Sequence, residues 1–143
     1  MKEIQIKNQL ETENFGLALA DKLVPGSVVA LTGDLGAGKT TLTKAIAKGL
    51  GIQSMVTSPT FLIIQEYKDG RLPLYHFDLY RINDEDEMDE LGYEEYFYGD
   101  GVCVLEWADR IKGLLPENTL WIHIKYGNEE NERIYKIDKY TGN

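Results

Sequence analysis

Apolar and polar residues are arranged along the chain in short segments that suit strands and helices. Residues 2–7 alternate polar and apolar side chains, which predicts a short edge strand. Apolar residues recur at every fourth position from Phe15 to Leu23, so we expect a surface helix over 12–23 with Thr12 as its N-cap. The chain therefore begins with a strand followed by a helix.

A second strand and helix follow. Residues 27–32 are mostly apolar and predict a strand. After a glycine-rich segment, Leu42, Ile46 and Leu50 mark one buried face of a helix, which ends at the glycines around its last turn.

The rest of the chain predicts further strands and short helical turns. Five apolar runs have the length of strands, the first two forming a hairpin and the last two an antiparallel pair: 61–67, 74–78, 102–106, 120–126 and 133–140. Six of the seven residues at positions 84–90 are acidic, which predicts helical turns at the surface. The pattern indicates an α/β fold, a mixed sheet with helices on both faces and C-terminal antiparallel strands.

Length and composition fit a single domain spanning residues 1–143. A chain of 143 residues buries about two thirds of its unfolded surface, so it needs no disulfide or structural metal to fold. Its one cysteine, Cys103, lies inside an apolar run and is expected to be a buried, reduced thiol. No apolar stretch reaches the length of a membrane span, and we expect a cytoplasmic protein without membrane contact.

The most informative motif is a phosphate-binding loop between the second strand and the second helix. It matches G-x-x-x-x-G-K-[ST] and consists of Gly33, Asp34, Leu35, Gly36, Ala37, Gly38, Lys39, Thr40 and Thr41. Glycines let successive N–H groups point into one concavity, and the helix that follows adds its own unpaired N–H donors. Lys39 supplies a point charge for the outer phosphates, and Thr40 offers a hydroxyl to Mg²⁺.

Two carboxylates end apolar strands and are candidates for the metal and the reaction. Asp78 follows the run 74–77, and Glu106 follows 102–105. Ligands of open α/β sheets sit beyond the carboxyl ends of the strands, where the phosphate loop also begins. One carboxylate can hold Mg²⁺, directly or through water, while the other orients the attacking water, and either acid can take either role.

Four other residues have alternative interpretations. Thr60 lies where nucleotide switches carry a hydroxyl that senses the γ-phosphate. Trp107 follows Glu106 and is either packed beside a nucleotide or an ordinary core or partner-facing aromatic. His76 and His123 lie in strand patterns, where a structural histidine is a more frequent outcome than a catalytic base.

Charge and missing motifs narrow the function. The net charge is −9, with 24 acidic and 15 basic residues, so long-range electrostatics disfavour direct binding to RNA. The guanine-specific N-K-x-D sequence is missing, which disfavours a GTP switch. A small-molecule kinase usually has an arginine-bearing lid, and the arginines here are scattered. A kinase and a nucleotide-gated assembly factor remain alternatives to an ATPase.

Four segments in order, 33–41, 58–61, 76–81 and 106–107, resemble the TsaE family of P-loop ATPases over nearly the whole chain. The resemblance implies a P-loop NTPase-like fold that binds ATP and Mg²⁺ through Lys39 and Thr40. It further implies that Glu106 is a metal ligand, and that Asp78 is a second acid near the metal that assists hydrolysis.

The resemblance also implies a role in RNA modification. Family members support formation of N6-threonylcarbamoyladenosine at position 37 of tRNAs that read codons beginning with adenine. Hydrolysis is expected to be slow and useful only in a complex with partners of the TsaB and TsaD type, so that tRNA is reached indirectly. By position, Gln9, Thr12 and Arg133 would lie near the adenine.

Overall fold

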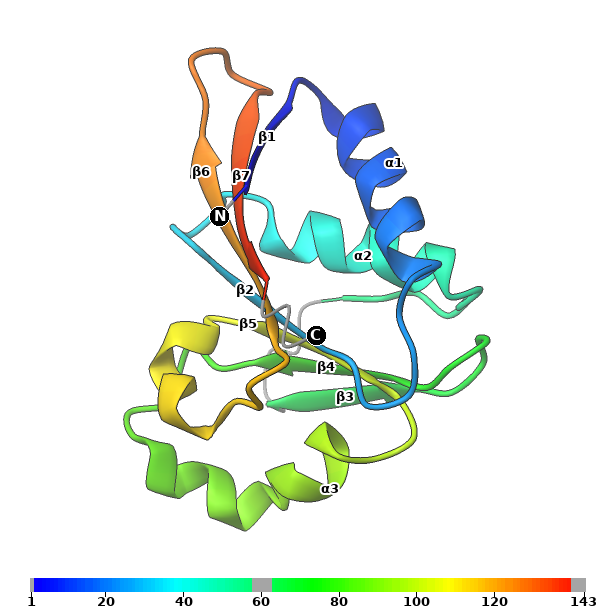
Figure 1. Ribbon diagram of the computed structural model, residues 1–143, viewed down its shortest axis with the longest axis vertical. Helices are drawn as coiled ribbons and strands as arrows, with labels where there is room; N and C mark the ends of the chain where they lie inside the picture. Colours follow the sequence, from blue (N-terminus) through cyan, green and yellow to red (C-terminus); the bar gives the residue numbers. More distant parts are fainter. Residues whose placement is uncertain (1, 58–62, 140–143) are drawn as a thin grey trace.

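The chain folds into a mixed sheet with helices packed on it (Figure 1). A computed structural model describes residues 2–57 and 63–139. The elements are β1 (Lys2–Ile6), α1 (Gln9–Ala20), β2 (Val28–Gly33), α2 (Lys39–Gly49), β3 (Ile64–Tyr67), β4 (Leu74–Asp78), the 3₁₀ helix η1 (Glu85–Leu91), α3 (Tyr93–Phe97), β5 (Val102–Glu106), the 3₁₀ helix η2 (Ala108–Leu114), β6 (Leu120–Tyr126) and β7 (Arg133–Lys139).

The strand order explains where the loop and the acids meet. Within the described residues the sheet has seven strands in the order β1-β7-β6-β2-β5-β4-β3. Strand β2 is parallel to both β5 and β6, and β4 is parallel to β5. The pairs β3–β4, β6–β7 and β1–β7 are antiparallel. The carboxyl ends of β2, β4 and β5 therefore lie together at one edge.

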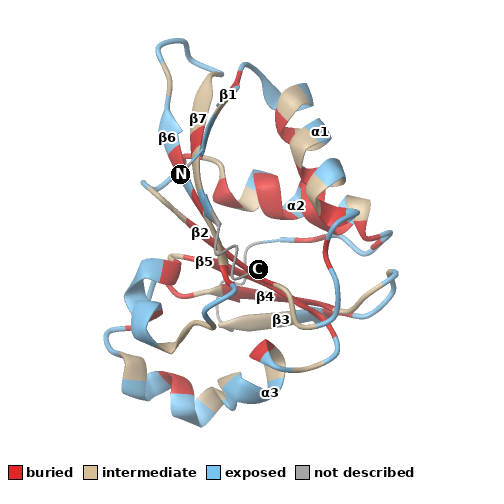
Figure 2. Ribbon diagram, viewed as in Figure 1, coloured by how far each residue is buried: buried red, intermediate tan, exposed pale blue. Residues whose placement is uncertain are grey.

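The helices cover both faces of the sheet, as the sequence predicted. Helices α1 and α2 lie on one face, and η1, α3 and η2 lie on the other (Figure 1). The central strands are buried between these layers (Figure 2). Alternation along β5 sends Val102 and Val104 into the core under α1 and α2, and Cys103 and Leu105 into the core on the other side. Among the described residues no helix is long and apolar enough to cross a membrane.

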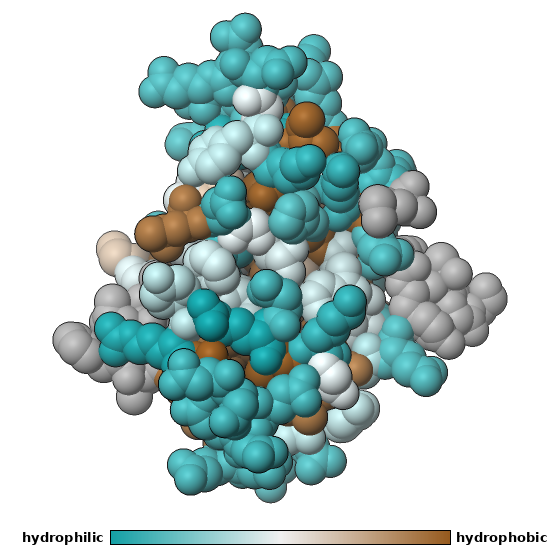
Figure 3. Space-filling model, turned by 90° about the vertical axis from the view of Figure 1, so that its left-hand side faces the viewer, coloured by the Kyte–Doolittle hydropathy of each residue, from teal (hydrophilic) through white to brown (hydrophobic). Residues whose placement is uncertain are grey.

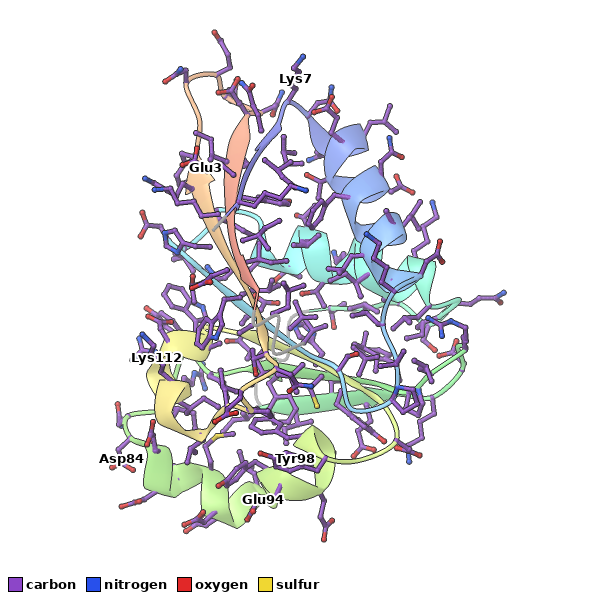
Figure 4. The ribbon with its side chains drawn as sticks, viewed as in Figure 1. Glu3, Lys7, Asp84, Glu94, Tyr98 and Lys112 are labelled. Carbon is purple, nitrogen blue, oxygen red and sulfur yellow. The ribbon has the colours of Figure 1, made fainter. Side chains whose placement is uncertain are left out.

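The acidic run forms a capped surface helix. In η1 only Met88 is buried, while the Asp84 side chain accepts from the backbone and Glu87 bonds back to complete a capping box. Asp84 and Glu94 lie at the bottom of Figure 4, on the opposite side of the sheet from α1 and α2. The prediction of surface helical turns at 84–90 is confirmed.

The predicted start of the first helix is wrong. Helix α1 begins at Gln9, and its N-cap is Asn8, whose Oδ1 accepts from Glu11 N at 2.9 Å. Glu11 in turn accepts from Lys7 N at 2.8 Å. Thr12 is buried within the helix and is not its N-cap. Asn8 takes that role, and Glu11 three residues later completes the spacing of N-cap and acid that is typical of a helix start.

Helix α1 packs very closely on α2, the helix that follows the phosphate loop. A Cβ atom on Gly16 would lie 2.4 Å from Ala45 Cβ and 3.0 Å from the Ala45 backbone. Only glycine allows this approach, so Gly16 helps to set the position of α2 against the sheet.

We expect Gly16→Val to lower the free energy of unfolding by about 1–3 kcal/mol, because overpacking forces the two helices apart. Denaturant unfolding followed by circular dichroism measures this change. Ala18→Val adds the same kind of side chain at an exposed position of α1 and is expected to cost only a few tenths of a kcal/mol. Equal unfolding midpoints for the two variants would contradict the close contact.

Candidate functional site

The loop between β2 and α2 has the backbone that its glycines allow. Gly33, Gly36 and Gly38 have φ values of 140°, 81° and 115°, which residues with a Cβ rarely adopt. A Cβ on Gly33 would also lie 2.4 Å from the Ile124 carbonyl oxygen of β6. The sequence therefore specifies both the turns of the loop and its close fit against the sheet.

Lys39 is held inside the loop. Its Nζ donates to the carbonyl oxygens of Gly33 at 2.7 Å and Asp34 at 2.9 Å, and lies 4.1 Å from the centre of the Trp107 ring. Burial lowers the pKa of Lys39 from its ordinary value, and the carboxylates of Glu106 and Asp78 act in the opposite direction. The ammonium is thus a buried cation facing acidic side chains.

The two predicted carboxylates lie side by side. Asp78 and Glu106 are direct partners in the parallel register of β4 and β5. Glu106 is only 3% exposed, and its Oε1 and Oε2 accept from Thr40 Oγ1 at 2.9 and 3.0 Å. Asp78 is half-buried, and its Oδ1 accepts from Tyr80 N at 3.1 Å. The acids thus share the end of the sheet with the first turn of α2.

Strand alternation explains why Glu106 reaches Thr40. Val104 faces the core under α2, so Glu106, two residues further along β5, points to the same face. Leu74 of β4 belongs to the same core, so His76 and Asp78, two and four residues further along the strand, also point to this face. The faces that carry the polar residues are therefore set by the pleat of each strand.

His76 is a site residue that the sequence analysis missed. Its side chain is fully buried, and its Nε2 lies 2.6 Å from Glu106 Oε2. The sequence interpretation treated it as a structural histidine. The feature of the sequence that could have identified it is its position two residues before Asp78, which places both side chains on one face of the strand.

A cavity of about 210 Å³ lies where the loop, Lys39 and the acids meet. It is lined by Leu35, Gly36, Gly38, Lys39, Thr40, Thr41, Asp78, Glu106 and Trp107. Figure 3 shows the face toward which β2, β4 and β5 point in Figure 1, and hydrophilic and intermediate side chains cover most of its middle. The cavity therefore unites most of the residues predicted for phosphate and metal binding.

Trp107 contributes an aromatic wall to this cavity. It has a left-handed backbone with φ 61°, and it immediately precedes η2. Its ring lies beside Lys39 and 4.9 Å from the ring of Tyr80. Trp107 also packs against the core on the η2 side of the sheet, so it is both a wall of the cavity and a partly buried core residue.

Of the three residues predicted near the adenine, two line a second hollow and one contacts the phosphate loop. Gln9 and Thr12 line a second hollow of about 200 Å³, together with Thr41, which also lines the first cavity. Arg133 instead supports the loop, since its Nε donates to the Ala37 carbonyl at 2.8 Å. Thr60, predicted to sense the γ-phosphate, lies outside the described residues.

Comparison with known proteins identifies the family of the chain. The family model for "Threonylcarbamoyl adenosine biosynthesis protein TsaE" matches residues 6–135. The curated tRNA threonylcarbamoyladenosine biosynthesis protein TsaE of Bacillus subtilis is 50% identical over 136 residues, which span 94% of this chain and 85% of that protein. The protein of the same name from Treponema pallidum is 44% identical over 124 residues, spanning 87% and 91%.

A solved structure has the same fold. The crystal structure of Bacillus subtilis YdiB matches with a TM-score of 0.82 and 42% sequence identity, covering 99% of this chain and 86% of that one. The family match spans far more than half of the chain, from β1 to β7. The chain is therefore a member of the TsaE family, with its α/β P-loop fold.

Proposed function

We propose that this protein binds Mg-ATP and hydrolyses it slowly, and that the nucleotide cycle supports threonylcarbamoyladenosine formation in tRNA. The family to which the chain belongs acts in that biosynthesis. The observation that carries the proposal is the contact of Thr40 with Glu106, 2.9 and 3.0 Å, at the first turn of the helix that follows the glycine loop. The contact joins a hydroxyl and a carboxylate, both of the kind that bind magnesium, beside a loop of the kind that binds phosphate.

The loop fits a polyphosphate. A Cβ on Gly38 would meet nothing within 4 Å, so the main chain at the start of α2 is open to a ligand. The N-terminus of α2 offers unpaired N–H groups there. Lys39 now donates to two main-chain carbonyls, and phosphate oxygens are stronger, charge-assisted acceptors for the same ammonium.

The acids fit magnesium bound together with phosphate. No group of three or more His, Cys, Asp or Glu side chains that could hold a metal occurs among the described residues. Thr40, Glu106 and Asp78 supply the hard oxygen ligands, and Mg²⁺ typically takes its remaining ligands from phosphates and water. When bound, Mg²⁺ neutralises charge on the phosphates during phosphoryl transfer.

The two carboxylates would divide the work of hydrolysis. Glu106 touches Thr40, which favours it as the magnesium-side acid. Asp78 lies next to it in the sheet register and lines the same cavity, where it would orient the attacking water. Trp107 lines the cavity, where it would limit the access of bulk water.

The adenosine would occupy the second hollow. Thr41 borders both hollows, so a nucleotide whose phosphates lie in the loop can extend past it toward Gln9 and Thr12. Arg133 would act indirectly, by fixing the Ala37 carbonyl behind the loop.

The chain would reach tRNA through protein partners of the TsaB and TsaD type. With a net charge of −9 it repels a polyphosphate backbone at long range. Partners that hold the RNA and carry the transfer chemistry would remove this obstacle. Slow hydrolysis then has its use within the assembly.

Lys39→Ala is expected to weaken Mg-ATP binding by about 10- to 100-fold, because charge-assisted hydrogen bonds to the phosphates are lost. Isothermal calorimetry measures the change. Lys125→Ala removes an equal charge from an exposed position of β6 and should leave the affinity unaltered. ATP affinity that is the same in all three proteins would defeat the assignment of the loop.

Glu106→Gln is expected to keep the fold and metal-free ATP binding but lower Mg²⁺-dependent hydrolysis by about 100-fold or more, since a charged oxygen ligand is lost. Phosphate release at saturating ATP measures this. Glu117→Gln, at an exposed position outside the cavity, is the matched control. Wild-type turnover in Glu106→Gln would remove this residue from the reaction.

The cellular role has its own test. In cells depleted of this protein, the threonylcarbamoyladenosine content of bulk tRNA should fall, and the unsubstituted gene should restore it while Lys39→Ala should not. Mass spectrometry of tRNA nucleosides measures the modification. Modification levels that do not depend on the protein would contradict the role, whatever its nucleotide chemistry.

A further inference from the structure

His76 in β4 is buried in an unusual way for a polar side chain. The residue is 0% exposed, and its Nε2 contacts Glu106 Oε2 at 2.6 Å. Its other ring nitrogen, Nδ1, is buried and has no hydrogen-bond partner among the described residues. Buried polar atoms normally find partners, so a side chain that leaves one unpaired is held there for the contact that it does make.

The contact is one half of a clamp on Glu106. Thr40 donates to both carboxylate oxygens from α2, and His76 approaches Oε2 from the neighbouring strand. Oε2 therefore faces both Thr40 and His76, whereas Oε1 accepts from the Thr40 hydroxyl at 2.9 Å. The clamp fixes the orientation of a side chain that has three rotatable bonds.

The Glu106 carboxylate determines which nitrogen of the His76 ring carries the hydrogen. A carboxylate only accepts, so Nε2 must carry the hydrogen and donate it to Oε2. Nδ1 is then the bare nitrogen. This assignment also avoids a buried N–H without an acceptor, which would be the alternative at Nδ1.

The clamp matters because Glu106 has a competing partner. Lys39 is buried in the same cavity, and among the charges around it that of Glu106 has the largest effect. Without a donor on the β4 side, the carboxylate can turn from Thr40 toward the ammonium. Such a turn would pair the Glu106 carboxylate with the Lys39 ammonium. The phosphates need the ammonium and the metal needs the carboxylate, so the pairing would compete with the binding of both.

We propose that His76 is a positioning residue, whose Nε2–H holds the Glu106 carboxylate against Thr40 in the orientation that receives magnesium. The inference rests on the proposed Mg-ATP function. Donors that orient a metal-binding carboxylate or histidine typically change metal affinity by 10- to 100-fold when they are removed.

The test compares His76→Leu, which removes the donor, with His76→Gln, whose amide N–H can replace it. ATP affinity is measured by calorimetry with excess Mg²⁺ and again with EDTA, and the ratio gives the magnesium enhancement. We expect about a tenfold smaller enhancement in His76→Leu, and a return to within about threefold of the unsubstituted value in His76→Gln.

Phe77→Leu is the matched control for packing. Phe77 is the next residue of β4, is fully buried, and belongs to the core on the opposite face. Its substitution lowers stability without touching Glu106, so the magnesium enhancement should be unchanged. A purely structural role for His76 would make His76→Leu behave like Phe77→Leu.

A second readout needs no nucleotide. The chain has two histidines, so ¹⁵N NMR of the imidazoles can be assigned by comparison with His76→Leu. We expect His76 to carry its hydrogen on Nε2 and none on Nδ1. A hydrogen on Nδ1, or an unchanged magnesium enhancement in His76→Leu, would overturn the inference alone. If the unsubstituted protein has no magnesium enhancement, the proposed function fails and this inference fails with it.

Discussion

The site depends on the burial of one carboxylate. Glu106 is 3% exposed at the end of a central strand, and an ionised group there is stable only if donors replace the water that it has lost. Thr40 and His76 are those donors, one from the helix after the phosphate loop and one from the adjacent strand. The carboxylate thus ties the helix, β4 and β5 into one rigid unit.

This constraint gives the fold a direct part in the chemistry. Parallel pairing of β4 and β5 sets Asp78 beside Glu106, and the pleat turns both toward the helix that carries Thr40. The close approach of α1 to α2 at Gly16 holds that helix against the sheet. Small shifts in packing far from the loop would therefore alter the distance between its hydroxyl and the acids.

Much of the fold could be predicted from the sequence because its signals are local. The run Val102–Glu106 is a strand with the predicted bounds, and the pairs β3–β4 and β6–β7 are antiparallel as expected. The start of α1 was predicted wrongly, because the fourfold apolar spacing begins later than the cap, which Asn8 provides. Nothing in the local pattern indicated that β6 would pair in parallel with β2.

The sequence by itself determined the phosphate loop and the two acids, since glycine conformations and strand ends are properties of neighbouring residues. Only the tertiary structure decided that Glu106 would contact Thr40, 66 positions away, and His76, 30 positions away. It also set the contact of Arg133 with the Ala37 carbonyl, 96 positions away. Such contacts depend on strand order and register, which follow from how all the buried faces pack together and not from any single segment.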